Sequence, residues 1–112
     1  MTKADQKRFA ALHRLGCICC LMLLDTHSDP DIHHLLSGGK RKGNEYTIPL
    51  CPWHHRSVAV GNMTNRAMTR AFGPSLADGS RTFDERWGTQ HQLLERVNGM
   101  LSSGKNMVAK EL

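Results

Sequence analysis

The sequence predicts a small α+β domain that is stapled by metal, with helices around a short pair of strands. Its 112 residues leave room for one domain with a modest core. Only three Phe, two Trp and one Tyr are available to fill that core. Small cores with few aromatic side chains usually need a disulfide or a metal, and four Cys and seven His could supply the ligands.

Hydrophobic periodicity and the positions of Gly and Pro predict a single domain over residues 1–112. Its expected parts are an N-terminal helix (1–16), a central metal-binding part (17–60), supporting helices (61–101) and a flexible tail (102–112). The expected elements after the first helix are strands at 31–35 and 46–50, followed by helices at 53–60, 62–72, 80–87 and 89–101. We find no internal repeat and no linker that would divide the chain.

Two Cys-containing knuckles predict a structural zinc site. Cys17 and Cys20 form a Cys-x-x-Cys pair, and Cys51 and His54 repeat the same spacing. Two ligands with two residues between them can both bind one tetrahedral Zn²⁺ across a knuckle turn. We therefore predict that Cys17, Cys20, Cys51 and His54 bind structural zinc, while Cys19 points away as a small buried residue.

The net charge and the lack of a signal-peptide pattern predict the cellular compartment and the class of partner. The most apolar window, residues 18–24, is too short to span a bilayer, and the N-terminus does not resemble a signal peptide. We expect a cytoplasmic protein without membrane contact, whose thiols stay reduced and bind metal. The net charge of +5 favours a polyanionic partner such as nucleic acid.

The residues between the two knuckles contain a histidine pair that predicts hydrolytic chemistry. His33 and His34 are adjacent on the strand at 31–35, so they face opposite sides and can divide the work of metal ligand and base. His55 follows His54 on the helix and could meet His33 at a second, open metal. A divalent ion there would stabilise a phosphorane-like transition state, and neutral His34 would take a proton from water. This is the chemistry of phosphodiester cleavage.

Basic side chains near this stretch are candidates for contacts with a nucleic-acid backbone. Three consecutive cations lie in the glycine-rich loop 37–44, and an i,i+4 pair lies on the helix at 62–72. A solvated hairpin loop is the usual alternative for such a run. The predicted DNA-binding residues are Lys40, Arg41, Lys42, Arg56, Arg66 and Arg70.

These segments resemble a known nuclease motif. DIHHLLSGG followed by TIPLCPWHHR resembles the HNH, or ββα-metal (His-Me finger), endonuclease motif, and Cys17-x-x-Cys20 is similar to its zinc-stabilised branch. Within that superfamily the chain looks most like the phage Ref family of RecA-dependent recombination-enhancing nucleases. The resemblance covers residues 17–94 and includes a Gly-Ser-Arg…Phe…Arg-Trp-Gly-Thr…Leu-Leu pattern at 79–94. It implies a small zinc-stapled ββα-metal core with surrounding helices.

The resemblance also implies roles for individual residues. His33 and His55 would bind the catalytic Mg²⁺ or Mn²⁺, a site that Zn²⁺ could also occupy, and His34 would be the general base. The implied substrate is DNA within a RecA filament, such as a displacement loop, in the cytoplasm of a phage host. Little base specificity is expected.

Two positions depart from the motif. Tyr46 stands where HNH enzymes have an Asn that orients the base, and Ala59 stands where many have a third metal ligand. The metal would then hold more water or borrow a ligand such as Asp31.

Two other functions remain open from the sequence. The departures favour a catalytically silent, zinc-stabilised DNA-binding module that uses Lys40, Arg41, Lys42, Arg66 and Arg70. A protein adaptor stapled by zinc explains the Cys set but leaves the three histidines 33, 34 and 55 without a purpose.

Overall fold

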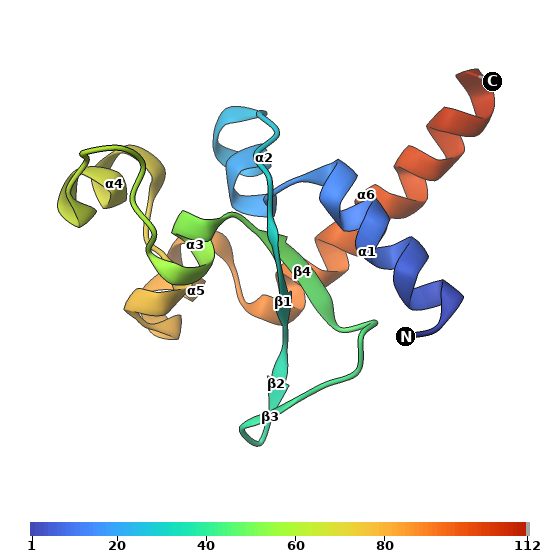
Figure 1. The fold of residues 1–112 in the computed structure, drawn as a ribbon, viewed down its shortest axis with the longest axis horizontal. Coiled ribbons are helices and arrows are strands. Elements are labelled where there is room, and N and C mark those ends of the chain that lie inside the picture. The colour runs from blue at the N-terminus through green and yellow to red at the C-terminus, as the bar shows by residue number, and fades with distance from the viewer. Residues whose placement is uncertain (112) are drawn as a thin grey trace.

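Helices surround a short antiparallel sheet in the computed structural model, which describes the backbone of residues 1–111 and the side chains of residues 1–103 (Figure 1). This confirms the predicted small α+β class. The elements are α1 (Lys3–Leu15), α2 (Ile18–Leu24), β1 (Asp31–His34), β2 (Leu36–Ser37), β3 (Lys40–Arg41), β4 (Thr47–Leu50), α3 (Pro52–Arg56), α4 (Asn65–Phe72), the 3-10 helix η1 (Leu76–Asp78), α5 (Ser80–Trp87) and α6 (Gln90–Glu111).

The central sheet pairs β1 with β4, and β4 is its buried strand. The register sets His33 opposite Ile48 and His34 opposite Thr47. All four residues of β4 are buried, because α1, α2 and α6 all pack against this strand. The two strands lie where the sequence predicts them, and β4 leads through Cys51 directly into α3. The chain therefore places His33 of β1 beside the helix that follows β4.

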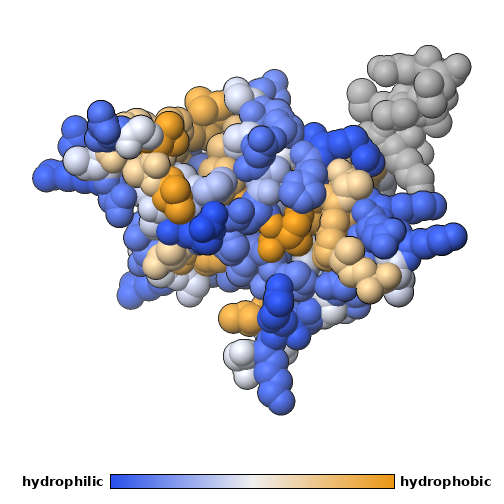
Figure 2. Space-filling view, viewed as in Figure 1, coloured by the Kyte–Doolittle hydropathy of each residue, from blue (hydrophilic) through white to orange (hydrophobic). Residues whose placement is uncertain are grey.

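A small hairpin, β2–β3, extends β1 away from the body of the molecule (Figure 1). Gly38 and Gly39 form its tip with φ angles of 60° and 81°, which favour glycine because a side chain is strained there. Figure 2 shows hydrophilic side chains over this projection. The predicted glycine-rich basic loop thus includes a hairpin on which Lys40 and Arg41 are exposed.

Arg8 joins three elements behind the sheet. Its guanidinium donates to the carbonyl oxygen of Thr47 (2.6 Å), to Thr47 Oγ1 (2.9 Å) and to Asn98 Oδ1 (2.9 Å). Helix α1 itself begins with a capping box between Thr2 and Asp5. These bonds fix α1 against β4 and α6, so Arg8 has a structural role.

Three helices differ from the sequence prediction. Residues 18–24 form α2, where the sequence was interpreted only as a knuckle followed by an uncertain stretch. Helix α3 ends at Arg56 and not at Val60, because Ser57 takes a left-handed conformation with φ 59°. Helix α6 continues to Glu111, past the expected end near Leu101. The predicted flexibility of residues 102–112 stays a prediction, and residue 112 lies outside the described residues.

Two further features surround the core. An apolar pocket of about 420 Å³ opens beside the Cys residues, between α2, α3 and α4. Its wall includes Cys20, Leu24, Trp53, Val60 and Phe72, so the apolar core is incomplete on that side. Within the described residues, no helix is long and apolar enough to cross a membrane.

Candidate metal centre and active site

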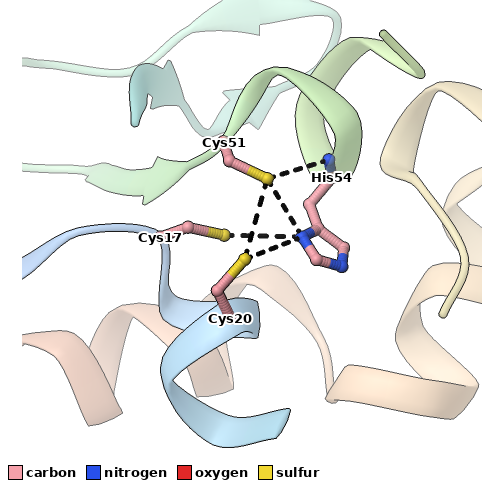
Figure 3. A group of neighbouring side chains, drawn as sticks. All are labelled: Cys17, Cys20, Cys51 and His54. Carbon is pink, nitrogen blue, oxygen red and sulfur yellow. Dashed lines mark hydrogen bonds between the residues drawn. The ribbon is translucent and has the colours of Figure 1, made fainter. Parts of the chain in front are cut away.

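Cys17, Cys20, Cys51 and His54 converge on one buried point (Figure 3). Their ligand atoms all lie within 4.8 Å of one another. The Nδ1 atom of His54 is 3.5, 3.7 and 3.2 Å from the sulfurs of Cys17, Cys20 and Cys51, and the Cys20 and Cys51 sulfurs are 3.9 Å apart. Tetrahedral zinc with ordinary bond lengths would separate sulfur from nitrogen by about 3.5 Å and sulfur from sulfur by about 3.8 Å. The tetrad could therefore bind a metal such as zinc, as the spacing predicts.

Local structure brings these four ligands together. Cys17 is the N-cap of α2 and Cys20 lies in its first turn, whereas Cys51 is the N-cap of α3 and His54 lies one turn later. A Cys-x-x-ligand spacing at a helix start sets both side chains toward the same side. Cys19 is buried outside the tetrad, as expected.

The last residue of α4 orients the ring of His54 through a hydrogen bond on the side away from the sulfurs. Its Nε2–H donates to the carbonyl oxygen of Phe72 (2.8 Å), which leaves Nδ1 for the metal. The next two carbonyls are also bonded: Trp53 Nε1 donates to Gly73 (3.0 Å) and Trp87 Nε1 donates to Pro74 (3.0 Å). Three consecutive carbonyls at the end of α4 are thus anchored around the metal centre.

The protonation of the metal-free tetrad follows from its burial and its hydrogen bonds. Bonds with Cys19 and Cys51, together with burial, raise the pKa of Cys17; bonds with Cys17 and Cys51 raise the pKa of Cys20. Bonds from Cys17 and Cys20 lower the pKa of Cys51. Burial alone would lower the pKa of His54, but its bonds with the Cys20 and Cys51 sulfurs raise it to about 9. Zinc must therefore displace protons from this site.

A second group lies at the interface between β1 and α3. The rings of His33 and His55 are edge to face, with centroids 5.0 Å apart. His55 Nδ1 donates to Asp31 Oδ2 (3.0 Å), and Arg56 Nε donates to the same oxygen (2.8 Å). The predicted meeting of His33 and His55 across this interface thus has its counterpart in the structure. Within the described part of the chain, however, only the Cys₃His tetrad brings three or more Cys, His or carboxylate ligand atoms within 4.8 Å of one another.

Burial and hydrogen bonding set the charge of this second group. Burial lowers the pKa of His33, so its imidazole is neutral at neutral pH. Burial alone would raise the pKa of Asp31, but the hydrogen bonds from Arg56 and His55 lower it. A neutral imidazole and an ionised carboxylate are the forms in which these groups serve a metal site.

Each of the three candidate histidines has one ring nitrogen bonded to a side-chain oxygen. His33 Nε2 bonds to Gln90 Oε1 (2.8 Å), and His34 Nε2 bonds to Asn44 Oδ1 (2.9 Å). His55 Nδ1 donates to Asp31. The ring nitrogens that have no bond to a side-chain oxygen are therefore Nδ1 of His33, Nδ1 of His34 and Nε2 of His55. These are the atoms that could act on a metal or a substrate.

His34 lies apart from the other two histidines. On β1 it alternates with His33, and its ring lies against Phe9 of α1 with centroids 6.2 Å apart. Arg41 Nη2 donates to Nδ1 of His34 at 2.7 Å, so the tautomer of the free protein has its proton on Nε2. His34 is thus bonded on both nitrogens, by Asn44 and by Arg41.

Sequence reasoning missed two of these partners. The motif comparison set Tyr46 at the position of the orienting Asn, yet Asn44, two residues earlier, bonds to His34. An Asn at the end of the basic loop was the available signal for it. Gln90 lies 57 residues from His33 in the sequence, and no local pattern connects the two.

The predicted DNA-binding cations lie in three parts of the molecule. Lys40 and Arg41 are exposed on β3, and the ammonium group of Lys42 lies over the ring of Tyr46 at 4.1 Å. Arg66 and Arg70 are exposed on α4, which lies in a different part of the molecule from the β2–β3 hairpin (Figure 1). Arg56, bonded to Asp31, lies beside the second group. These assignments stay predictions.

The chain is thus a small α+β protein with a Cys₃His tetrad that could bind a metal and a second group of histidines beside it. A family model described as "Recombination enhancement, RecA-dependent nuclease" matches residues 2–102. The chain belongs to this family of RecA-dependent nucleases, which confirms the narrower resemblance stated from the sequence. No solved structure matches the chain.

Proposed function

We propose that the chain is a metal-dependent DNA endonuclease of the HNH type, phage-encoded and acting in recombination on RecA-bound DNA such as displacement loops. One observation carries the proposal: His33, His34 and His55 each have one ring nitrogen held by a side-chain oxygen, on a strand–loop–strand–helix unit. Such support fixes which nitrogen is available for chemistry. The family description supplies the nuclease activity and the dependence on RecA.

In this proposal His33 and His55 hold the catalytic divalent ion, Mg²⁺ or Mn²⁺, with Zn²⁺ able to occupy the same site. The donor set fits, because two ring nitrogens from facing residues remain after the bonds to Gln90 and Asp31 are counted. A bound ion would stabilise the charge that develops on the phosphate and the leaving oxygen. Asp31 supports His55 as a carboxylate behind a ligand, and its second oxygen is a candidate for the ligand that Ala59 does not supply.

His34 acts as the general base in this scheme. Asn44 holds the proton on Nε2, so Nδ1 is the atom that would accept a proton from the attacking water. Asn44 thereby takes the orienting role that the sequence comparison expected at Tyr46. Arg41 occupies Nδ1 in the free protein. A DNA phosphate is a stronger partner for a guanidinium than a neutral imidazole is, so substrate binding would draw Arg41 away and free the base.

The substrate is DNA, bound through its phosphates. Arg41 of the hairpin bonds to His34, Lys40 and Lys42 flank it in the sequence, and the net charge is +5. Phosphate contacts position a protein on DNA without reading its sequence, so little base specificity is expected. Arg56, Arg66 and Arg70 would extend the contact. RecA is the proposed protein partner on the strength of the family description, and the site of action would be the cytoplasm of the host cell.

The test is cleavage of plasmid DNA and of a displacement loop with Mg²⁺ or Mn²⁺, with and without RecA and ATP. His34→Ala should keep the bound zinc and lose nicking, whereas His91→Ala, at an exposed histidine of α6, should cleave like the wild type. Nicking by His34→Ala at the wild-type rate would refute the role of the base. Cleavage that needs no RecA would keep the HNH chemistry and remove RecA-bound DNA as the required substrate.

The alternative is a catalytically silent, zinc-stabilised DNA-binding module. It is favoured by Ala59 at the position of a third ligand and by the bonds that occupy both nitrogens of His34. This alternative predicts tight, salt-sensitive DNA binding with no cut under any of the conditions above.

A further inference from the structure

Gln90 contacts the candidate metal site from the far end of the chain. Its Oε1 atom accepts a hydrogen bond of 2.8 Å from Nε2 of His33, although the two residues are 57 positions apart in the sequence. Both side chains are half-buried. A neutral imidazole has one N–H and one lone pair, so a bond that takes the N–H decides which nitrogen is left for a ligand.

The position of Gln90 is set by its own helix. It is the first residue of α6, and a capping box fixes that start: Thr89 N–H donates to Gln92 Oε1 (2.8 Å), and Gln92 N–H donates to Thr89 Oγ1 (3.1 Å). The following turns bury Leu93 and Leu94 in the core, and α6 packs on β4. Gln90 therefore meets His33 as a fixed acceptor on a rigid element.

We propose that Gln90 is a positioning residue for the catalytic metal: it holds the proton of His33 on Nε2 and turns Nδ1 toward His55. The inference rests on the proposed function, because it takes His33 as a metal ligand. Its support is geometric, since the rings of His33 and His55 lie edge to face at 5.0 Å while the Gln90 oxygen holds Nε2. An acceptor behind a metal-binding histidine fixes its ring and strengthens its remaining nitrogen as a donor.

The expected effect is a loss of affinity for the second metal without a loss of zinc. Removing such a supporting acceptor commonly weakens metal binding about 10–100-fold. Gln90→Leu keeps the approximate size of the side chain and removes the acceptor. Gln90→Glu keeps an oxygen at the same reach, so it should bind the metal at least as tightly as the wild type.

The experiment measures Mn²⁺ affinity of the zinc-loaded protein by calorimetry, together with the tautomer of His33 by ¹⁵N NMR of the imidazole. Gln90→Leu should bind Mn²⁺ about 10–100-fold more weakly and lose the single Nε2–H tautomer. Gln90→Glu should rescue both. His91→Ala is the matched control, because it removes an exposed side chain next to Gln90 on α6 and leaves the cap intact, and it should leave the affinity and the tautomer unchanged.

His33→Ala distinguishes the role of Gln90 from the existence of the proposed metal site. If His33→Ala weakens Mn²⁺ binding but Gln90→Leu does not, Gln90 has no positioning role and the proposed metal site stands. If His33→Ala binds Mn²⁺ like the wild type, His33 is not a ligand, and both the proposed site and the role of Gln90 are refuted. Equal losses in Gln90→Leu and His91→Ala would assign the effect to a general disturbance of the helix start and would also overturn the inference.

Discussion

Zinc binding to the tetrad should release about three protons at pH 7, and this number follows from the metal-free site. The pKa values of Cys17 and Cys20 are raised, so both thiols hold protons, and the pKa of His54 is about 9, so its ring is protonated too. The pKa of Cys51 is lowered, so this sulfur is already a thiolate. Zinc binds thiolates and neutral imidazole, and the three protons on Cys17, Cys20 and His54 must therefore leave.

The sign and size of the pH dependence follow directly. Groups with raised pKa values hold protons more firmly, so acidification favours the metal-free state and weakens zinc. Release of three protons means that the apparent zinc affinity falls about a thousandfold for each pH unit between pH 8 and pH 6. Each such step corresponds to about 4 kcal/mol of binding free energy. A structural zinc contributes about 10–16 kcal/mol, which is comparable to the whole stability of a domain. Loss of zinc on mild acidification should therefore lower the melting temperature of the protein.

Competition with a chromophoric zinc chelator at several pH values between 6 and 8 measures this slope. Calorimetry in two buffers with different heats of ionisation counts the protons independently. Cys19→Ala, at a buried thiol outside the tetrad, should retain one zinc per chain, whereas Cys51→Ser should lose it. An affinity that changes tenfold or less per pH unit would refute the protonation states assigned here. A metal-free protein that keeps its melting temperature would refute the stapling role.

Two further substitutions test other parts of the structure. Arg8→Met removes the three hydrogen bonds to Thr47 and Asn98 and should lower the free energy of unfolding in urea titrations by about 2–3 kcal/mol. Lys7→Met, at an exposed residue of the same helix, is its control. Equal urea midpoints for the two variants would contradict the structural role of Arg8. Arg41→Gln removes the cation bonded to His34. It should leave the melting temperature unchanged and reduce the salt dependence of DNA binding by about one phosphate contact, so an unchanged salt slope would exclude Arg41 from the interface.

Local patterns in the sequence were sufficient for the metal tetrad and the two strands. A Cys-x-x-Cys or Cys-x-x-His spacing is itself a local geometry, so Cys17, Cys20, Cys51 and His54 could be assigned together without a fold. Helix α2 was missed because residues 18–24 are almost wholly apolar and lack the polar face that identifies a surface helix. The early end of α3 depends on the left-handed conformation of Ser57, a residue type that gives little warning of it.

The contacts that complete the candidate site depend on tertiary packing. Asn44 reaches His34 only because the chain returns from the hairpin to pair β4 with β1, and Gln90 reaches His33 only because α6 packs across β4. A motif assigns roles by position along the chain, so it assigned the orienting role to the position of Tyr46. It gave no indication that Gln90, 57 residues from His33, accepts a hydrogen bond from that histidine. Which of these residues act in catalysis stays a prediction for the experiments above.

Helix α3 connects the Cys₃His tetrad with the proposed catalytic site. This helix has only five residues, too few to be stable alone, so its position depends on Cys51 and His54 in the tetrad and on the bonds from Trp53 and His54 to the end of α4. His55 is the next residue after the zinc ligand, and Asp31 then sets its ring from β1. A zinc ion in the tetrad would therefore fix one wall of the proposed catalytic site. The proposal thus predicts that loss of zinc from the tetrad also disturbs the position of His55.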